Sequence, residues 1–304
     1  MSHILSKVDI EFSEYREVFI YFVVDEYLKN CAYHIETKCS ASNSYPKLSD
    51  AEVIFVFLMS FSSYGGNYSR AMSSLYNAGY IKQKLSKGQF SQRIYALYPY
   101  IFDIYSLFGT IAKAVNTKYA LDTFPLALCH NIRIKRCKII KGEEHRGYNS
   151  SKKEYFFGFK VHIITALDGT VTEFEFSPGR LEDLAGYNLL NFDLPTGSEL
   201  FMDKAYNFYQ REDELSECAE IIPNVIRKSN SLKEDNTYVQ NLLKQIDRKH
   251  VETDISLIER LFPKKIHVTN VKGFYLKILG FILVHNINIF FDQSIDLYNK
   301  LNFN

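Results

Sequence analysis

The stretches KYALD at residues 118–122 and LFMD at residues 200–203 decide the fold class of this chain. Each is a short, mostly apolar run that ends in an aspartate, Asp122 in the first and Asp203 in the second. Short apolar runs of this kind are typical of strands buried inside a sheet. Because α/β proteins place their chemistry at the carboxyl ends of such strands, both aspartates are candidate functional residues.

A β-hairpin is predicted between these two strands. Residues 155–167 (YFFGFKVHIITAL) are rich in β-formers, and residues 170–176 (TVTEFEF) alternate strictly between apolar and polar. Asp168-Gly169 between the two runs is a strong hairpin signal. Helices are expected at 181–190 and 206–218, and a last strand at 220–223. This order predicts a mixed α/β layer fold.

The residues before the first strand predict an all-helical N-terminal domain over 1–116. Ser49 with Glu52 three residues later forms a capping box, which predicts a helix from there to about Phe61. Further helices are expected at 14–30, 68–76, 86–97 and 102–115, with Pro99 interrupting between the last two. Short helices of this kind suit a helix-turn-helix-like DNA-binding unit and equally a plain helical cap. The cations that favour DNA are Lys82, Lys84, Lys87 and Arg93.

The second domain is expected over residues 117–296, with a polar insertion at about 227–247. A helix is predicted over 247–262, with an apolar stripe at Val251, Ile255, Ile258 and Phe262. The last helix, from Gly273 to about Phe291, is apolar but interrupted by polar residues. It falls short of a membrane span and is predicted to be a buried helix.

The net charge of the 304-residue chain is only +1, so any nucleic-acid signal must come from the distribution of charge. The stretch from Arg133 to Lys160 contains nine Lys or Arg and three Glu, a local excess of six positive charges. Within this stretch, residues 132–140 alternate between isoleucine and basic residues. A solvated loop would explain the excess, but its place between two strand-like runs favours contact with phosphates.

Cysteines and the chain start indicate the compartment. The five cysteines are odd in number and include no C-x-x-C pair, so neither a disulfide framework nor a zinc ribbon is indicated. The spacing of Cys129, His130, Cys137 and His145 fits no common zinc pattern. The first residues lack the basic start and apolar core of a signal peptide. We therefore expect a soluble, cytoplasmic protein.

The pair Asp122 and Asp203 is a candidate metal site. Two neighbouring carboxylates repel each other unless a cation lies between them. Hard oxygen ligands favour Mg²⁺ or Mn²⁺ over zinc. Glu252 is the best candidate for a third ligand, because it lies beside the apolar stripe of its helix; Glu259 is the reserve and Asp254 is weaker. The alternative is that these acids only cap turns.

Several blocks, taken together and in order, resemble the DDE-type transposases of bacterial insertion sequences, whose catalytic core is similar to ribonuclease H and retroviral integrase. The blocks are LDTFP (121–125), CHNIRI (129–134), EHRGY (144–148), FGFKVH (157–162), DKAY (203–206), RKHVET (248–253) and LFPKKIH (261–267). LSDAEV (48–53) and Gly66-Asn67 match the N-terminal part of that family. The resemblance implies a ribonuclease H-like mixed-sheet core behind an all-helical N-terminal domain.

The resemblance also assigns roles. Asp122, Asp203 and Glu252 would be the catalytic acids and would hold Mg²⁺ or Mn²⁺, as two ions. The residues expected to contact DNA are Arg133, Arg136, Arg146, Lys152, Lys160 and Arg248. His162 either faces the same site or is satisfied inside the fold. Gln245 and Glu259 stand where some family members have Tyr and Lys, which leaves their auxiliary phosphate contacts in doubt.

The implied function is metal-dependent cleavage and strand transfer of DNA, with transposon ends and target DNA as partners and at least a homodimer on DNA. Base readout would belong to the N-terminal helices and backbone contact to residues 133–160. Three alternatives remain at this point. They are a non-catalytic or repurposed DNA-binding protein of the same fold, a hydrolytic nuclease, and a helical interaction module.

Overall fold

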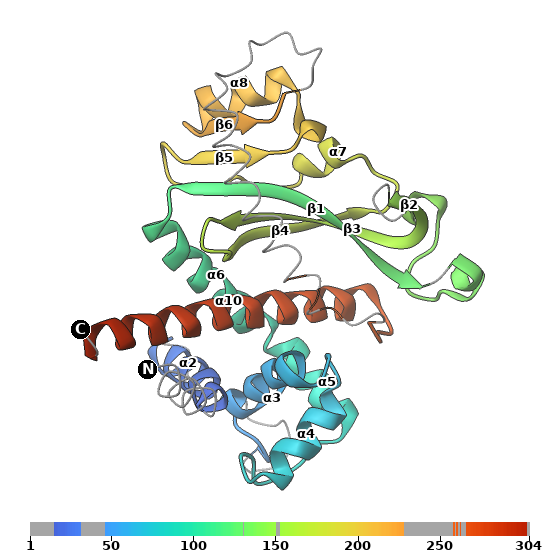
Figure 1. Cartoon of the computed structure of the whole chain (residues 1–304). Coiled ribbons are helices and arrows are strands. Elements are labelled where there is room, and N and C mark those ends of the chain that lie inside the picture. Colours follow the sequence, from blue (N-terminus) through green and yellow to red (C-terminus); the bar gives the residue numbers. More distant parts are fainter. Residues whose placement is uncertain are drawn as a thin grey trace, which may run out of the picture. The chain divides into compact units, whose positions relative to one another are not determined.

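The computed structural model describes residues 15–31, 46–129, 131–149, 153–227 and 266–302, together with residues 258, 260 and 262 (Figure 1). Its α-helices are α2 (Arg16–Asn30), α3 (Asp50–Ser63), α4 (Tyr68–Asn77), α5 (Lys87–Ala96), α6 (Tyr98–Val115), α7 (Asp183–Tyr187), α8 (Tyr209–Cys218) and α10 (Val271–Asn302). Short 3₁₀ helices are η1 (Asn131–Arg136), η2 (Glu143–His145) and η3 (Lys204–Tyr206). The strands are β1 (Lys118–Cys129), β2 (Arg146–Asn149), β3 (Glu154–Ala166), β4 (Val171–Pro178), β5 (Glu199–Met202) and β6 (Ile222–Val225).

The chain divides into two compact units. A helical unit comprises residues 1–106 and 276–304, and a sheet unit comprises residues 107–275. The sequence placed the first boundary at 116 and assigned residues up to 296 to the sheet domain, whereas most of α10 groups with the helical unit. The reason is packing: Phe281 of α10 lies against Phe61 of α3, with ring centroids 4.7 Å apart. A helix that is apolar in sequence does not show which unit it will join.

Local start signals determine the helices of the helical unit. The capping box predicted at Ser49 is present, and Ser86 makes the same reciprocal hydrogen bonds at the helix start expected there, so α3 and α5 begin where the sequence indicates. One expectation is wrong: Pro99 does not interrupt. It lies in the first turn of α6, where a proline needs no N–H partner, so the helix begins at Tyr98.

The stretch Val271–Asp296 of α10 is long and apolar enough to cross a membrane by length and composition, which corrects the expectation that it falls short. However, 78% of an apolar 18-residue window within that stretch is buried inside the protein. The core helix of a soluble protein passes the same length test, so this finding is weak evidence for a membrane span. The prediction of a buried helix is confirmed.

The described strands form one mixed sheet of six strands. The main order is β2-β3-β1-β5-β6, and β4 pairs with β3 on the same side as β2 (Figure 1). β3 is antiparallel to β1, β2 and β4, whereas β1, β5 and β6 are mutually parallel. The hairpin predicted at Asp168-Gly169 is present, with Gly169 at a φ of +88°. The antiparallel strands β1, β3 and β4, followed in the chain by β5 and β6 parallel to β1, form a ribonuclease H-like sheet, as expected, with the short β2 added beside β3.

The expectation that the first strand ends at Asp122 is wrong. β1 continues to Cys129, paired throughout with β3, because Phe124, Leu126 and Leu128 continue the apolar alternation. Only the parallel pairing of β1 with β5 ends near the acid, at Leu121 opposite Met202. Pro125 is tolerated in this extension because β1 has a single strand neighbour there among the residues described.

Three further expectations differ in extent, and the alternating residues 132–140 form no strand: after the last β1–β3 pair, Cys129 opposite Phe157, the chain turns into η1. α7 has only five residues, and Tyr206 lies in η3, with α8 starting at Tyr209. The last strand, β6, starts at Ile222 rather than at residue 220, because its register follows Glu199 of β5.

One face of the sheet carries a buried apolar cluster. It contains residues of β1, β3 and β5 together with residues from α7 and α8: Tyr119, Leu121, Ile164, Leu200, Met202, Tyr187 and Leu215. Arg227 and Glu212, both nearly buried, pair at 2.7 Å and so join the end of β6 to α8. This face therefore has a firmly packed backing.

Candidate active site

Asp122 and Asp203 occupy equivalent positions on neighbouring parallel strands. Each follows directly after the last registered pair, Leu121 opposite Met202. Adjacent strands lie about 4.8 Å apart, so the two acids are neighbours. Leu121 and Met202 point into the buried apolar cluster. Since successive strand residues point to opposite faces, both aspartates leave the sheet on the other face, where they are partly exposed.

Backbone groups orient both carboxylates. Asp122 accepts a hydrogen bond of 2.6 Å from the N–H of Thr123, and Asp203 accepts one from the N–H of Lys204 at the start of η3. The two carboxylates also act on the hydroxyl of Tyr206. Burial raises the pKa of this hydroxyl, and the negative charges of Asp183, Asp122 and Asp203 raise it further. Two partly exposed carboxylates held side by side are oxygen ligands of the type that Mg²⁺ and Mn²⁺ take. The donor set therefore fits a divalent cation.

The predicted third acid, Glu252, lies outside the described residues, as do Arg248, Gln245, Asp254 and Glu259. Of the residues that follow Glu252 in sequence, only 258, 260 and 262 are described before residue 266. Ile258 is helical and buried, and the ring of Phe262 lies 5.9 Å from that of Phe124. Phe124 is two residues from Asp122 and so lies on the same face of β1. Within the described ranges, no group of three possible metal ligands occurs.

Behind the acids lies a chain of hydrogen-bonded side chains, here called the polar chain: Ser177, His162, Thr123 and Tyr206. His162 Nε2 lies 2.8 Å from Ser177 Oγ, and His162 Nδ1 lies 2.7 Å from Thr123 Oγ1. Thr123 Oγ1 lies 2.6 Å from the Tyr206 hydroxyl. All of these residues except Thr123 are buried, with His162 and Ser177 at 0% exposure.

His162 is neutral in this setting. Burial lowers its pKa from 6.5 to about 4, with Asp183 opposing the shift and Lys160 adding to it. A neutral imidazole has one N–H and one acceptor nitrogen, so it passes a hydrogen bond along the polar chain in one direction. The structure thus places His162 inside the fold with both nitrogens satisfied, the second of the two alternatives that the sequence left open.

Helix α7 packs against the polar chain at His162. A Cβ on Gly186 would lie 1.9 Å from Cε1 of His162, so only glycine allows this close approach. In the first turn of the same helix, Asp183 accepts a hydrogen bond of 2.7 Å from Lys160. Lys160, expected to face DNA or metal, is thus held in an ion pair with its side chain 17% exposed.

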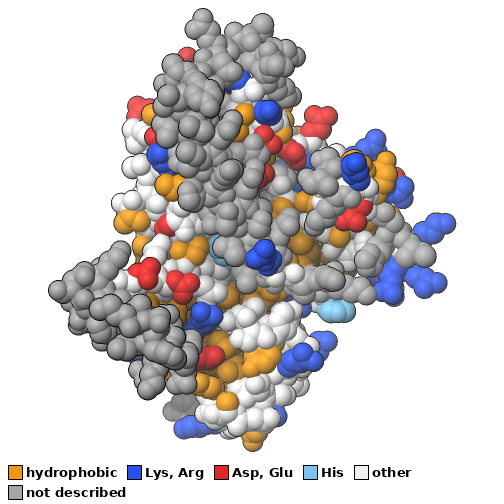
Figure 2. Space-filling view, viewed as in Figure 1, with side chains coloured by type: hydrophobic (Ala, Val, Ile, Leu, Met, Phe, Trp, Pro, Cys, Tyr) orange, Lys and Arg blue, Asp and Glu red, His pale blue; other side chains and the backbone are white. Residues whose placement is uncertain are grey.

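The other predicted DNA contacts lie at a projecting basic segment. Arg133 and Arg136 are exposed on η1, and Arg146 is exposed on β2 with an ion pair of 3.4 Å to Glu143. Figure 2 shows Lys and Arg side chains gathered at the right over this segment. Its exposed cations are Arg133, Lys135, Arg136, Lys138, Lys141 and Arg146. Lys152 lies outside the described residues.

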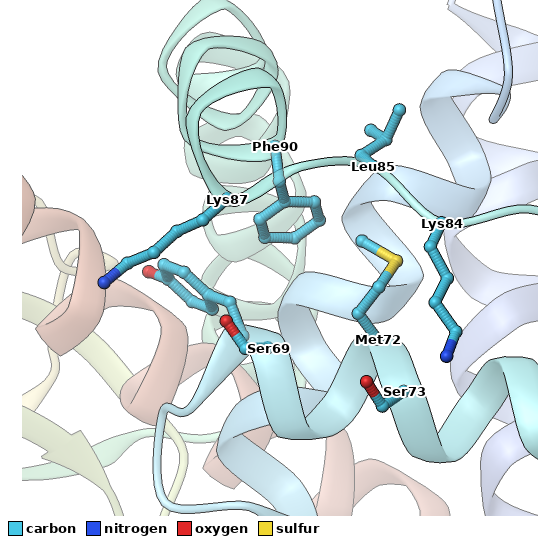
Figure 3. Close-up of a pocket in the computed structure, with 8 residues that line it drawn as sticks. Ser69, Met72, Ser73, Lys84, Leu85, Lys87 and Phe90 are labelled. Atoms are coloured by element: carbon cyan, nitrogen blue, oxygen red, sulfur yellow. The ribbon is translucent and has the colours of Figure 1, made fainter.

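The helical unit has a cavity of about 120 Å³ between α4 and α5. Tyr68, Met72 and Phe90 form apolar walls, whereas Lys84 and Lys87 extend on opposite sides of them (Figure 3). The charge of Lys87 acts together with burial to lower the pKa of Lys277 to about 8. Ser69, Ser73 and Leu85 complete the lining, so none of the described residues that line the cavity is acidic.

A ribonuclease H-like sheet with paired acids at neighbouring strands places this chain in the ribonuclease H-like class. The sequence profile of the transposase DDE domain matches residues 113–269, just over half of the chain, and includes all three predicted acids. The chain therefore belongs to the DDE transposase family, which generally uses divalent metal ions. Comparisons with curated proteins and with solved structures gave no match.

Sequence reasoning missed the polar chain and the contacts that α7 makes with it. Tyr206 lies in the quoted DKAY block, but no role was given to it. Thr123 follows Asp122 directly, and strand alternation alone would have placed its hydroxyl on the buried face. Asp183 and Gly186 carried no usable signal, because their role depends on a five-residue helix that the pattern extended too far.

Proposed function

We propose that this protein is an active transposase that cleaves DNA at the ends of an insertion sequence and joins the resulting 3′-hydroxyl to target DNA. The observation that carries the proposal is the placement of Asp122 and Asp203 at matching positions beside the last β1–β5 pair, within a transposase DDE domain. Transposon ends and target DNA are the substrates, and we place the protein in the bacterial cytoplasm, where such DNA lies.

Asp122 and Asp203 would hold two Mg²⁺ or Mn²⁺ ions together with Glu252. When bound, such ions activate an attacking oxygen and neutralise charge at a scissile phosphodiester. The chain itself positions the reactants: β1 and β5 fix the two aspartates on one face, and Arg248 contacts a DNA phosphate. No covalent enzyme intermediate is needed, because positioning and charge neutralisation account for the rate.

DNA backbone contact belongs to the basic segment around η1 and to the lysines of the helical unit. Six exposed cations lie between Arg133 and Arg146, and Lys84 and Lys87 flank a cavity whose described lining residues include no acid. Phosphate contacts release counterions, so each one steepens the salt dependence of binding. Replacing Arg133 and Arg136 by Gln should weaken binding to all sequences and reduce the slope of log K against log[salt] by roughly two.

The direct test uses labelled DNA that carries the inverted repeats flanking the coding sequence, with Mg²⁺ and the full chain. Wild type should nick and join this DNA, whereas Asp203→Asn should bind it without cleavage. Glu217→Gln is the matched acid-to-amide control, since Glu217 is exposed on α8. Cleavage by Asp203→Asn at the wild-type rate would refute the assignment of the acids.

Other outcomes separate the rival functions. Specific binding with no metal-dependent cleavage would indicate a repurposed DNA-binding protein, and cleavage without joining would indicate a nuclease. A protein that binds no DNA even at low salt would indicate a helical interaction module. Light scattering with and without end DNA tests the proposed assembly of at least a dimer on DNA.

A further inference from the structure

The backbone pairing between β1 and β5 stops one residue short of the two acids. The last registered pair is Leu121 opposite Met202, so Asp122 and Asp203 lie just beyond it. Both are carboxylates, and like charges on neighbouring strands push the strand ends apart. Some other contact must therefore hold the acids together when no cation is bound.

The Thr123–Tyr206 hydrogen bond supplies such a contact at the right place. Thr123 follows Asp122, and its backbone N–H donates to the Asp122 carboxylate over 2.6 Å. Tyr206 is three residues after Asp203, and its backbone N–H donates to the Asp203 carbonyl over 2.9 Å. The bond of 2.6 Å between the two hydroxyls thus ties the segment that carries one acid to the segment that carries the other.

His162 and Ser177 extend the hydrogen-bonded chain beyond Thr123 and so fix the orientation of the Thr123 hydroxyl. Thr123 Oγ1 bonds His162 Nδ1 on one side and the Tyr206 hydroxyl on the other, so two of its hydrogen-bonding positions are directed. Ser177 fixes the far side of the ring, and Gly186 lies directly against it. A buried polar group without partners is unfavourable, and directional bonds of this kind fix distances that apolar packing does not.

We propose that Thr123 and Tyr206 are positioning residues whose hydroxyl–hydroxyl bond, braced by His162 and Ser177, sets the separation of the Asp122 and Asp203 carboxylates and thereby the affinity of the site for divalent cations. The inference rests on the proposed function, because it takes the two aspartates as cation ligands. If the polar chain has only a structural role, the same changes should alter stability and leave cation affinity unchanged.

The test measures Mn²⁺ binding by the full chain without DNA, from the electron paramagnetic resonance signal of free Mn²⁺. Thr123→Val keeps the shape of the side chain and removes the hydroxyl, Thr123→Ser keeps the hydroxyl, and Tyr206→Phe removes the other partner. Partners that orient metal ligands typically contribute 10- to 100-fold to affinity. We therefore expect Thr123→Val and Tyr206→Phe to weaken Mn²⁺ binding about tenfold, and Thr123→Ser to bind as wild type.

The double variant and a stability measurement complete the design. If both residues act through one bond, Thr123→Val combined with Tyr206→Phe should weaken Mn²⁺ binding no more than either change alone. Thermal unfolding in EDTA establishes for each variant that the protein is folded. Wild-type Mn²⁺ affinity in folded Thr123→Val and Tyr206→Phe would overturn the inference.

The controls separate this inference from the proposed function. Asp203→Asn must abolish the tight Mn²⁺ binding of wild type if the aspartates are the ligands. If Asp203→Asn binds Mn²⁺ as wild type does, the cation site itself is refuted, and the inference falls with it. If Asp203→Asn loses binding while Thr123→Val does not, the site stands and only the positioning role is refuted.

Discussion

The two faces of β1 differ sharply although they alternate along one strand. On one face, Asp122 is partly exposed and lies beside Asp203. On the other, Leu121 is 2% exposed, and Thr123 bonds the buried His162. On the buried face the polar groups are hydrogen-bonded to one another, whereas the acid face places two like charges together beside buried apolar residues such as Phe124. The polar chain and the candidate metal ligands therefore lie on opposite faces of β1, and substitutions on the two faces should have separable effects on stability and on catalysis.

The largest effect is expected on the acid face. Asp122→Asn should reduce DNA cleavage at least about a thousandfold, because removing a ligand of a catalytic metal removes several kcal/mol of transition-state stabilisation. The unfolding temperature should stay the same or rise, because the repulsion from Asp203 is relieved. Cleavage assays and thermal unfolding of one preparation test both halves. A strongly destabilised Asp122→Asn would contradict the division between the faces.

The second largest effect is a loss of stability at acidic pH, caused by His162 on the buried face of β1. The pKa of His162 is lowered to about 4 in the folded protein from 6.5. Between these pH values the unfolded chain binds a proton that the folded protein does not, so stability falls as the pH falls through this window. The full lowering of the His162 pKa corresponds to a loss of about 3 kcal/mol in the free energy of unfolding.

The pH experiment needs a control because other groups titrate nearby. Asp183 and Lys160 act on His162 directly, and its ring contacts Thr123 and Ser177. Denaturant unfolding of wild type and His162→Gln between pH 7 and 4 isolates the histidine. Wild type should lose more stability on acidification than the variant, and equal slopes would show that His162 is protonated in the fold.

A smaller effect is expected where α7 meets the polar chain. Gly186→Ala places a methyl group 1.9 Å from His162 Cε1, and overpacking of this kind destabilises by about 1–3 kcal/mol. Gly88→Ala is the matched control, since nothing lies within 4 Å of its Cβ position. Chemical denaturation measures both. Unchanged stability of Gly186→Ala would show that α7 is not firmly seated on His162.

The smallest effect lies in the helical unit and serves as a remote reference. Ser49→Ala removes the side chain that accepts the Glu52 N–H at the start of α3. The loss of such a cap destabilises by about 1 kcal/mol. Calorimetry should detect this loss, while Mn²⁺ affinity at the acids should not change. A change in Mn²⁺ affinity would mean that the two units are coupled.

Much of this architecture follows from local patterns. The capping box of α3, the hairpin at Asp168-Gly169 and the short strand before Asp203 depend on nearest neighbours, and the structure has them as predicted. The paired acids depended on a further step, that two apolar runs lie next to each other in the sheet. The resemblance to a family supported that step, whereas spacing alone did not.

The remainder depended on contacts between distant residues. Nothing near Asp122 indicates that β1 continues, because the pairing that extends it comes from β3. The pairing of Lys160 with Asp183 and the approach of Gly186 to His162 likewise join segments about 20 residues apart. Such tertiary contacts give no local signal, so the ion pair of Lys160 with Asp183 could not be predicted from the sequence.

The proline in β1 has a consequence for the behaviour of the protein at high concentration. From Thr123 to Cys129, β1 has one strand partner in the described part of the chain, so its second edge resembles a template for intermolecular strand addition. Proline is tolerated in a sheet where its N–H side faces away from the partner strand, so Pro125 presents its missing donor to this edge. An incoming strand would therefore lose a ladder bond near the middle of the edge. The proline that is tolerated in the extension of β1 thus protects the molecule against self-association into extended sheets.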